Sequence, residues 1–336
     1  MKILITGGAG FIGSELGKFM LQQGADVILL DNLEYGYRDN FEDNEILKNN
    51  FIKADIRDKN FAKYLQGVDV LYHFAGISAL PECEANPYKA FDVNVSGVAN
   101  VLDACRSSNV KKIIFASTSA VYENNDSKER HKENDMVYPN LIYATSKYCA
   151  EQICKSYAQN YDMDIVICRF FNVFGPHQDF KRKYPPFTSY IIKEALSDNV
   201  PTIYNTQDCK RDYIYVQDLL QYLYKMALSD QKYQAEIFNL ATSNAYSAMD
   251  IAQTVYKILG KDFIYNEGNP DAFWDKYTNL FDKNYNLKRD RIKKEVFKNC
   301  LGDGTKVAKE FDYVAKTNLS DGLAEIIDYQ RNSKDK

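Results

Sequence analysis

Histidine and cysteine are scarce in this chain. It has three histidines, far apart in the sequence, and seven cysteines with no Cys-X-X-Cys pair. We therefore expect no metal site, and reduced thiols rather than a disulfide framework. No apolar run approaches the roughly 18 residues that cross a bilayer, and no secretory signal precedes the first predicted strand, so we expect a cytoplasmic protein without a membrane partner. The net charge of −4 gives no electrostatic reason to expect nucleic acid as a partner.

What the sequence does contain is a regular alternation of short apolar and longer amphipathic stretches through its first half. The pattern predicts strands at 2–6, 27–31, 51–54, 69–74, 112–117 and 164–170, and helices at about 11–23, 61–66, 88–107 and 142–160. Such alternation is typical of a parallel sheet covered by helices on both faces. The predicted fold class is α/β, a Rossmann-type doubly wound parallel sheet with a smaller mixed α/β region.

The first predicted strand runs directly into Gly7, Gly10 and Gly13, which are spaced by three and open a helical pattern. In a strand, turn and helix unit of this kind, the glycines allow a tight turn, close approach of a pyrophosphate, and close packing of helix on strand. Asp31 ends the second strand, 18 positions beyond Gly13. Its carboxylate can accept hydrogen bonds from both ribose hydroxyls of an adenosine and would repel a 2'-phosphate. The unit predicts NAD rather than NADP, the alternative being that Asp31 merely begins a loop.

Tyr143 and Lys147 stand four residues apart in a helical pattern, so their side chains share one face of the helix. A phenol has a reference pKa of about 10. It acts as a base near neutral pH only if its anion is stabilised, and a neighbouring ammonium provides that stabilisation. The spacing alone leaves a chance pairing open, because the chain contains 26 tyrosines.

These features belong to a longer series of motifs that occur in the order of the extended short-chain dehydrogenase/reductase family. More narrowly, the chain resembles NAD-dependent nucleotide-sugar epimerases/dehydratases, above all the UDP-galactose and UDP-N-acetylglucosamine 4-epimerases. The resemblance runs from residue 1 to about 220. The motifs that carry it are Thr6–Gly13, Asp31–Asn32, Asp55–Ile56, His73–Gly76, Asn94, Ser117–Ser119, Tyr143 with Lys147, Arg169–Pro176 and Arg211–Asp218.

The resemblance implies NAD as the cofactor and assigns residues to it. Lys147 would bind the nicotinamide ribose and, together with the positive ring, lower the pKa of the Tyr143 phenol. Asp55 and Ile56 would frame the adenine. The cofactor-binding residues expected on this basis are Gly7, Gly10, Phe11, Ile12, Asp31, Asn32, Asp55, Ile56, Phe74, Ala75, Gly76, Asn94, Ser117, Tyr143 and Lys147.

The resemblance also implies a nucleotide-diphosphate sugar as the substrate. Tyr143 would take the proton from a sugar hydroxyl, usually at C4, while the hydride on that carbon passes to the nicotinamide. The expected catalytic residues are Tyr143, Lys147 and Thr118, and the expected substrate-binding residues are Thr118, Ser119, Asn172, Arg211 and Lys298. The guanidinium of Arg211 suits phosphate oxygens. We expect Arg169 to be structural and Trp274 and Tyr277 to serve packing.

Two positions depart from the dehydratases of this superfamily. Those enzymes place an Asp-Glu pair directly after the catalytic threonine, whereas this chain has Ser119 and Ala120. Alanine cannot move a proton, so the sequence argues against 4,6-dehydration. We expect a C4 epimerase with a transient 4-keto intermediate, supplying sugars for surface polysaccharide. The main alternative is a 4-dehydrogenase that acts on a UDP- or GDP-linked hexose or heptose and releases a 4-keto product. A more remote alternative is a catalytically dead regulator that senses NAD. Such a protein would be expected to lose the Tyr143 and Lys147 pair.

The regular alternation weakens beyond Pro176. We expect an NAD-binding domain over 1–175 with a returning segment at about 211–245, and a nucleotide-sugar-binding region over 176–210 and 246–336. The resemblance implies a homodimer joined through the helices at 88–107 and 142–160.

Overall fold

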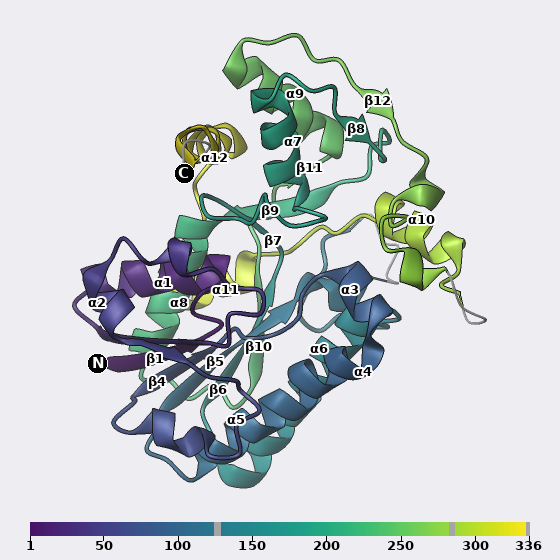
Figure 1. The fold of residues 1–336 in the computed structure, drawn as a ribbon. Helices are drawn as coiled ribbons and strands as arrows, with labels where there is room; N and C mark the ends of the chain where they lie inside the picture. The colour runs from purple at the N-terminus through teal and green to yellow at the C-terminus, as the bar shows by residue number, and fades with distance from the viewer. Residues whose placement is uncertain (124–128, 282–285, 334–336) are drawn as a thin grey trace.

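The computed structural model describes residues 1–123, 129–281 and 286–333. A large parallel sheet with helices on both sides forms the lower part of the molecule in Figure 1, and a smaller group of helices and short strands stands above it. The α/β doubly wound prediction is confirmed. Among the described residues, no helix combines the length and apolar character needed to cross a membrane.

The main sheet has seven strands in the order β10-β6-β5-β4-β1-β2-β3, all parallel. The first three strands run outward from β1 in one direction, and β4, β5 and β6 run in the other. The order therefore reverses between β1 and β4, where doubly wound sheets bind ligands beyond the carboxyl ends of their strands. The strands are β1 (Lys2–Thr6), β2 (Asp26–Asp31), β3 (Phe51–Lys53), β4 (Val70–His73), β5 (Lys112–Thr118), β6 (Ile165–Phe170) and β10 (Glu236–Leu240).

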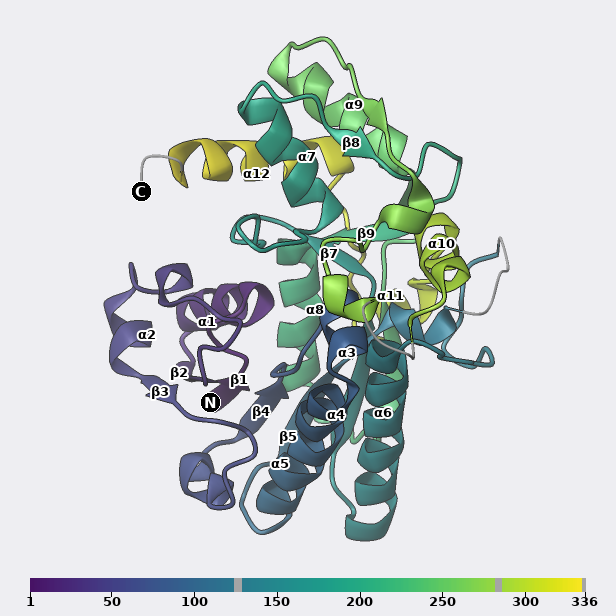
Figure 2. The ribbon, with the colours of Figure 1, turned by 45° about the vertical axis from the view of Figure 1, so that its right-hand side comes forward.

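Alternate residues of the strands fill separate cores on the two faces of the sheet. Ile3 and Ile5 of β1 pack into the core that also contains residues of α1 (Phe11–Gln22) and α8 (Val216–Leu228). Leu4 faces the other core, which α5 (Gly97–Arg106) and α6 (Ile142–Tyr161) cover. Figure 2 shows α4, α5 and α6 together on one side of the sheet and α1 and α8 on the other.

Two predicted helices differ from the structure. The stretch at 88–107 is α4 (Pro87–Phe91), a π-helical turn at Asp92–Ser96, and then α5. The helix is continuous through this turn, and the side chain of Asn94 exchanges hydrogen bonds with the backbone of Ile77 there. The stretch at 61–66 is a short 3-10 turn, Phe61–Leu65, followed by Gly67 in a left-handed conformation with φ of 71°.

The smaller region lies beyond the carboxyl ends of the sheet strands (Figures 1 and 2). It contains a three-stranded sheet in the order β11-β9-β7, and a pair formed by β12 and β8. The elements of the whole chain not yet described are α2 (Glu45–Asn49), which lies beside α1 in the lower part, α3 (Leu80–Ala85), β7 (Asn172–Phe174), α7 (Phe187–Leu196), β8 (Thr202–Ile203), β9 (Arg211–Tyr215), β11 (Ala245–Tyr246), α9 (Ala248–Leu259), β12 (Asn266–Glu267), α10 (Arg289–Phe297), α11 (Thr305–Glu310) and α12 (Leu319–Ser333).

Candidate active site

The glycine turn after β1 needs its glycines for two separate reasons. Gly7 has φ of 70°, and a Cβ there would lie 2.8 Å from the backbone nitrogen of Ala75. A Cβ on Gly13 would lie 2.2 Å from the carbonyl oxygen of Gly7. Gly10 precedes α1, and no side chain caps the amides of the first turn of that helix. The turn therefore brings bare backbone and a helix N-terminus to the switch point of the sheet, which suits an anionic pyrophosphate.

Asp31 lies at the end of β2 and is 9% exposed. Its carboxylate accepts hydrogen bonds from the backbone N–H groups of Ala9, at 3.1 Å, and Leu33, at 2.8 Å. Burial raises the pKa of Asp31, and these two bonds partly oppose the rise. Each oxygen keeps a further lone pair, so the carboxylate both orders the loop and can accept hydrogen bonds from a ribose.

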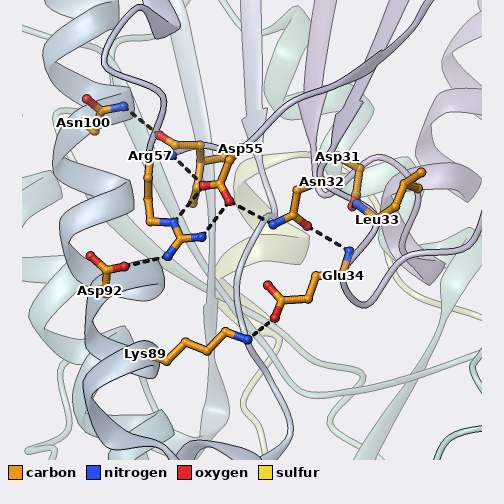
Figure 3. A network of polar contacts seen from close by, with 10 residues as sticks. Asp31, Asn32, Leu33, Glu34, Asp55, Arg57, Lys89, Asp92 and Asn100 are labelled. Carbon is orange, nitrogen blue, oxygen red and sulfur yellow. Dashed lines mark hydrogen bonds and ion pairs between the residues drawn. The ribbon is translucent and has the colours of Figure 1, made fainter.

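A network of charged and amide side chains fixes the turn after β3 (Figure 3). Arg57 donates to both carboxylate oxygens of Asp55 and, at 2.6 Å, to Asp92 on the π-helical turn. Asn32 donates to Asp55 at 3.0 Å, and Asn100 donates to the carbonyl oxygen of Ile56 at 2.7 Å. The Arg57 hydrogen bonds hold the pKa of Asp55 well below its usual value. Sequence reasoning named Asn32, Asp55 and Ile56 but missed Arg57.

His73 and Thr6 shape the Phe74–Gly76 turn. The Thr6 hydroxyl accepts hydrogen bonds from the backbone N–H groups of Phe74 and Ala75, so its own proton is directed to Nδ1 of His73, 2.7 Å away. Burial, with the positive charge of Lys147, lowers the pKa of His73 to about 3. A neutral histidine thus locks the turn that passes beside Gly7.

Tyr143 of α6 and Thr118 at the end of β5 come close enough for the Thr118 hydroxyl to influence the Tyr143 phenol. Burial raises the pKa of Tyr143 to about 12, and the nearby Thr118 hydroxyl only partly offsets the rise. Burial also lowers the pKa of Lys147 to about 8, and its ammonium lies 4.4 Å from the centroid of the Phe115 ring. The protein alone therefore holds Tyr143 as a neutral phenol, and the lowered phenol pKa that the sequence predicts needs a further positive charge.

Asn94 and Ser117 are engaged by protein partners. The Asn94 amide donates to the hydroxyl of Ser146 on α6 at 3.0 Å, besides its bonds to Ile77. The Ser117 hydroxyl donates to Glu151 on α6 at 2.5 Å. Both side chains therefore tie neighbouring elements to the helix that carries Tyr143.

Arg169 is 2% exposed and forms a bidentate pair with the buried carboxylate of Glu151, at 2.9 and 2.7 Å. Its third contact is the hydroxyl of Tyr122, at 2.7 Å. Trp274 is buried in a small apolar cluster. Both residues are structural, as expected. Tyr277 stacks on Tyr184 and donates to a carboxylate oxygen of Glu82.

Arg211 of β9 and Lys298, directly after α10, meet at one carboxylate. Arg211 donates to the backbone carbonyl oxygen of Glu295 at 2.6 Å and lies 3.6 Å from its carboxylate. The ammonium of Lys298 lies 2.7 Å from the same carboxylate. Burial opposes ionisation of Glu295, but Lys298 and Arg211 hold its pKa below the usual value. Sequence reasoning missed Glu295, although its position three residues before Lys298 at a helix end could have indicated the pair.

Asn172 and Ser119 border the same region. Asn172 begins β7 and donates to the carbonyl oxygen of Asp212, the neighbour of Arg211, at 2.8 Å. Burial raises the pKa of the Cys300 thiol, and Lys298 and the Ser119 hydroxyl partly oppose the rise. Cys300 pairs with Arg211 in an isolated β-bridge. Ala120 follows directly and brings no titratable group.

The family model of the NAD dependent epimerase/dehydratase family matches residues 3–241. The UDP-glucose 4-epimerase of Lactobacillus helveticus is 32% identical over 285 residues, which cover 80% of this chain and 84% of the relative. The structure of UDP-glucuronic acid 4-epimerase from Bacillus cereus, in complex with UDP-glucuronic acid and NAD, is 26% identical with a TM-score of 0.84 and covers 99% of this chain and 100% of that chain. The complex of the Thermus thermophilus UDP-glucose 4-epimerase with NAD is also 26% identical, with a TM-score of 0.83 over the same shares of both chains. The chain belongs to the NAD dependent epimerase/dehydratase family.

Proposed function

We propose that the protein inverts the configuration at C4 of a nucleotide-activated sugar, with NAD as its resident cofactor and a 4-keto sugar as the transient intermediate. The observation that carries the proposal is the placement of Tyr143 beside Thr118, with Lys147 on the same helix as Tyr143. Ala120 stands where a dehydratase needs a further acid. The related proteins named above, which act on UDP-sugars, make a uridine diphosphate sugar the first substrate to test.

The residues at the switch point of the sheet fit NAD. Gly7 and Gly13 leave no room for a side chain against the backbone, and the open N-terminus of α1 supplies amides for a pyrophosphate. Asp31 would accept the hydroxyls of the adenosine ribose, and Lys147 would hold those of the nicotinamide ribose. Bound NAD would supply the acceptor of the C4 hydride, later its donor, and a positively charged ring.

Tyr143 would act as the single acid and base. In the first half of the reaction its phenolate takes the proton of the C4 hydroxyl as the hydride leaves C4, and in the second half it returns that proton to the same oxygen. Thr118 holds that oxygen beside the phenol. Because burial raises the pKa of Tyr143 to about 12, the phenolate depends on the positive charges of Lys147 and the bound cofactor.

Arg211 and Lys298 would bind the diphosphate of the substrate. Both cations are held beside Glu295 before any phosphate arrives, so little side-chain entropy is lost on binding. Asn172 lies next to Arg211 through its bond to Asp212 and would complete the donor set, with Ser119 beside the sugar.

The test is an incubation of the purified protein, with any cofactor it retains, with UDP-, GDP- and dTDP-sugars. Nuclear magnetic resonance reports the C4 configuration of the product, and absorbance reports the reduced nicotinamide. Inversion at C4 without net reduced cofactor is the expected result. A released keto sugar with one equivalent of reduced cofactor would refute the epimerase and favour the 4-dehydrogenase. Tyr143→Phe removes either activity and keeps NAD binding.

The proposal extends to the setting of the enzyme. We place the enzyme in the cytoplasm, where nucleotide sugars and NAD are available and where the free thiols of the described cysteines would stay reduced. We assign the NAD domain to 1–175 with the return at about 211–245, and the sugar-nucleotide region to the remainder. We also propose a homodimer joined through α4, α5 and α6, and a role in supplying sugars for surface polysaccharide; light scattering tests the dimer.

A further inference from the structure

We infer that Glu123, held in place by Arg291, is a positioning residue for Tyr143. The inference rests on the proposed function, because it concerns the efficiency with which Tyr143 moves its proton. Glu123 directly follows the 3-10 turn Ser119–Tyr122, which begins one residue after Thr118. Glu123 therefore belongs to the same short segment as Thr118.

Glu123 also contacts the start of α6, the helix that carries Tyr143. Its side chain is fully buried, and one carboxylate oxygen accepts hydrogen bonds from the backbone N–H groups of Asn140 and, at 2.7 Å, Leu141. Leu141 is the residue before α6, and Tyr143 is the second residue of that helix. The first amides of a helix have no partner within the helix, so a carboxylate there fixes both the position and the direction of the first turn.

A second carboxylate holds the next amide. Glu84 at the end of α3 accepts a hydrogen bond from the backbone N–H of Ile142 at 2.7 Å. Burial raises the pKa of Glu84, and the Ile142 bond and the charge of Arg291 oppose the rise. Three consecutive amides at the start of α6 are thus bound by two carboxylates from outside the helix, and α6 itself supplies no side-chain cap.

A cation from the second half of the chain pairs with the carboxylate of Glu123. Arg291 on α10 donates to the second carboxylate oxygen of Glu123 at 2.6 Å, and its side chain is 16% exposed. The same guanidinium contributes to the low pKa of Glu295, one helical turn further along α10, where Arg211 and Lys298 meet. Arg291 therefore links the start of the catalytic helix to the helix that borders the proposed diphosphate site.

This arrangement predicts what loss of either partner does. Removing Arg291 leaves a buried, uncompensated carboxylate at Glu123, which draws in water and releases the Asn140 and Leu141 amides. The first turn of α6 then loosens, and Tyr143 loses its alignment with Thr118 and the sugar oxygen. Proton transfer slows, while the Arg211 and Lys298 side chains that bind the diphosphate remain. The expected signature is a lower kcat with little change in KM.

The test compares Glu123→Gln, Arg291→Met and Arg291→Lys with the wild type, each loaded with NAD. We expect kcat to fall about tenfold or more in Glu123→Gln and Arg291→Met, with KM changed less than about twofold. Arg291→Lys, which keeps a cation near the carboxylate, recovers part of the rate. The double variant Glu123→Gln/Arg291→Met loses no more than the worse single variant, because the two side chains act as one unit. Arg289→Met is the matched control, since Arg289 lies on the same helix and forms an exposed ion pair with Asp275.

A second measurement does not depend on substrate. Hydrogen exchange of the amides at 140–147 speeds up in Glu123→Gln and Arg291→Met and not in Arg289→Met, while thermal unfolding shows that all variants are folded. Wild-type kcat together with wild-type exchange in Glu123→Gln and Arg291→Met would overturn the inference, and so would equal losses in kcat and in NAD affinity. If the wild type inverts no nucleotide sugar, the proposed function is refuted, and the exchange rates alone decide whether Glu123 and Arg291 hold the start of α6.

Discussion

The pKa of Tyr143 provides the most direct test of the proposed chemistry. Burial raises this pKa to about 12, so at pH 8 only about one phenol in ten thousand is ionised. Half ionisation at pH 8 requires the phenolate to be stabilised by roughly 5 kcal/mol more. One cation about 4 Å away supplies roughly 4 kcal/mol at an effective dielectric constant of 20. Lys147 stabilises the phenolate by less than this, because its own pKa of about 8 leaves its amine only partly charged at pH 8.

We therefore expect the phenolate of Tyr143 to form near neutral pH only when oxidised NAD is bound. The assay is a pH titration of phenolate absorbance on NAD-free protein, on protein with oxidised NAD and on protein with reduced NAD. The same titration of Tyr143→Phe is subtracted in each case, since the chain has 26 tyrosines. A step should appear below about pH 9 with oxidised NAD and move above about pH 10 in the other two states. Lys147→Met should raise the midpoint of the step.

Identical midpoints in the three cofactor states would refute the reasoning, because they would mean that the charge of the cofactor does not reach the phenol. The sign of the pH dependence follows directly. A base whose pKa in the loaded enzyme lies near 8 is active above that pH, so kcat should rise as the pH increases through the measured midpoint and then level off.

Three further outcomes follow from single contacts. Asp31→Asn removes the carboxylate expected to repel a 2'-phosphate, so calorimetry should find the ratio of the NADP to the NAD dissociation constant lowered about tenfold; an unchanged ratio would contradict the assignment. Lys298→Met should raise KM for the nucleotide sugar about tenfold with NAD affinity unaltered, and a normal KM would exclude Lys298 from the diphosphate site. Arg169→Met leaves Glu151 buried without its partner and should cost about 3 to 5 kcal/mol in urea denaturation. Arg106→Met, which breaks an exposed pair with Asp103, should cost less than about 1 kcal/mol, and equal losses would count against a buried role.

Local patterns were sufficient to predict the central sheet. All six strands expected from the sequence occur within one residue of the predicted ends, because a strand buried on both faces is a short apolar run with clear boundaries. The seventh strand, β10, reads Glu-Ile-Phe-Asn-Leu and carries two polar residues. Its identity depends on pairing with β6, a contact that no local pattern contains. The π-helical turn at Asp92–Ser96, where the Asn94 side chain bonds to the backbone of Ile77, was likewise not predicted.

The residues of the candidate site also fall into those that local sequence patterns predict and those that depend on distant contacts. Gly7, Asp31, Tyr143 and Lys147 could be named from the sequence because each sits at a fixed distance from a strand or helix that the sequence predicts. The carboxylates Glu123 and Glu295 could not, because their importance lies in which cation each meets. Glu123 meets Arg291 only when α10 lies against the start of α6, and Glu295 meets Arg211 only when α10 lies against β9.

These two carboxylates explain how the weakly patterned second half can serve a precise reaction. Each buried acid is bound to a cation from another element, so a displacement of α10 would separate charges in a region of low dielectric constant and cost several kcal/mol. Glu295 fixes the side of α10 that borders the proposed diphosphate site, and through Arg291 and Glu123 the same helix is fixed against the first turn of α6. Ion pairs therefore set the distance between the groups proposed to bind the diphosphate and the phenol proposed to move the proton. A 4-epimerase needs this constraint, because the sugar must turn over between the two hydride transfers while its diphosphate and its C4 oxygen partner stay in place.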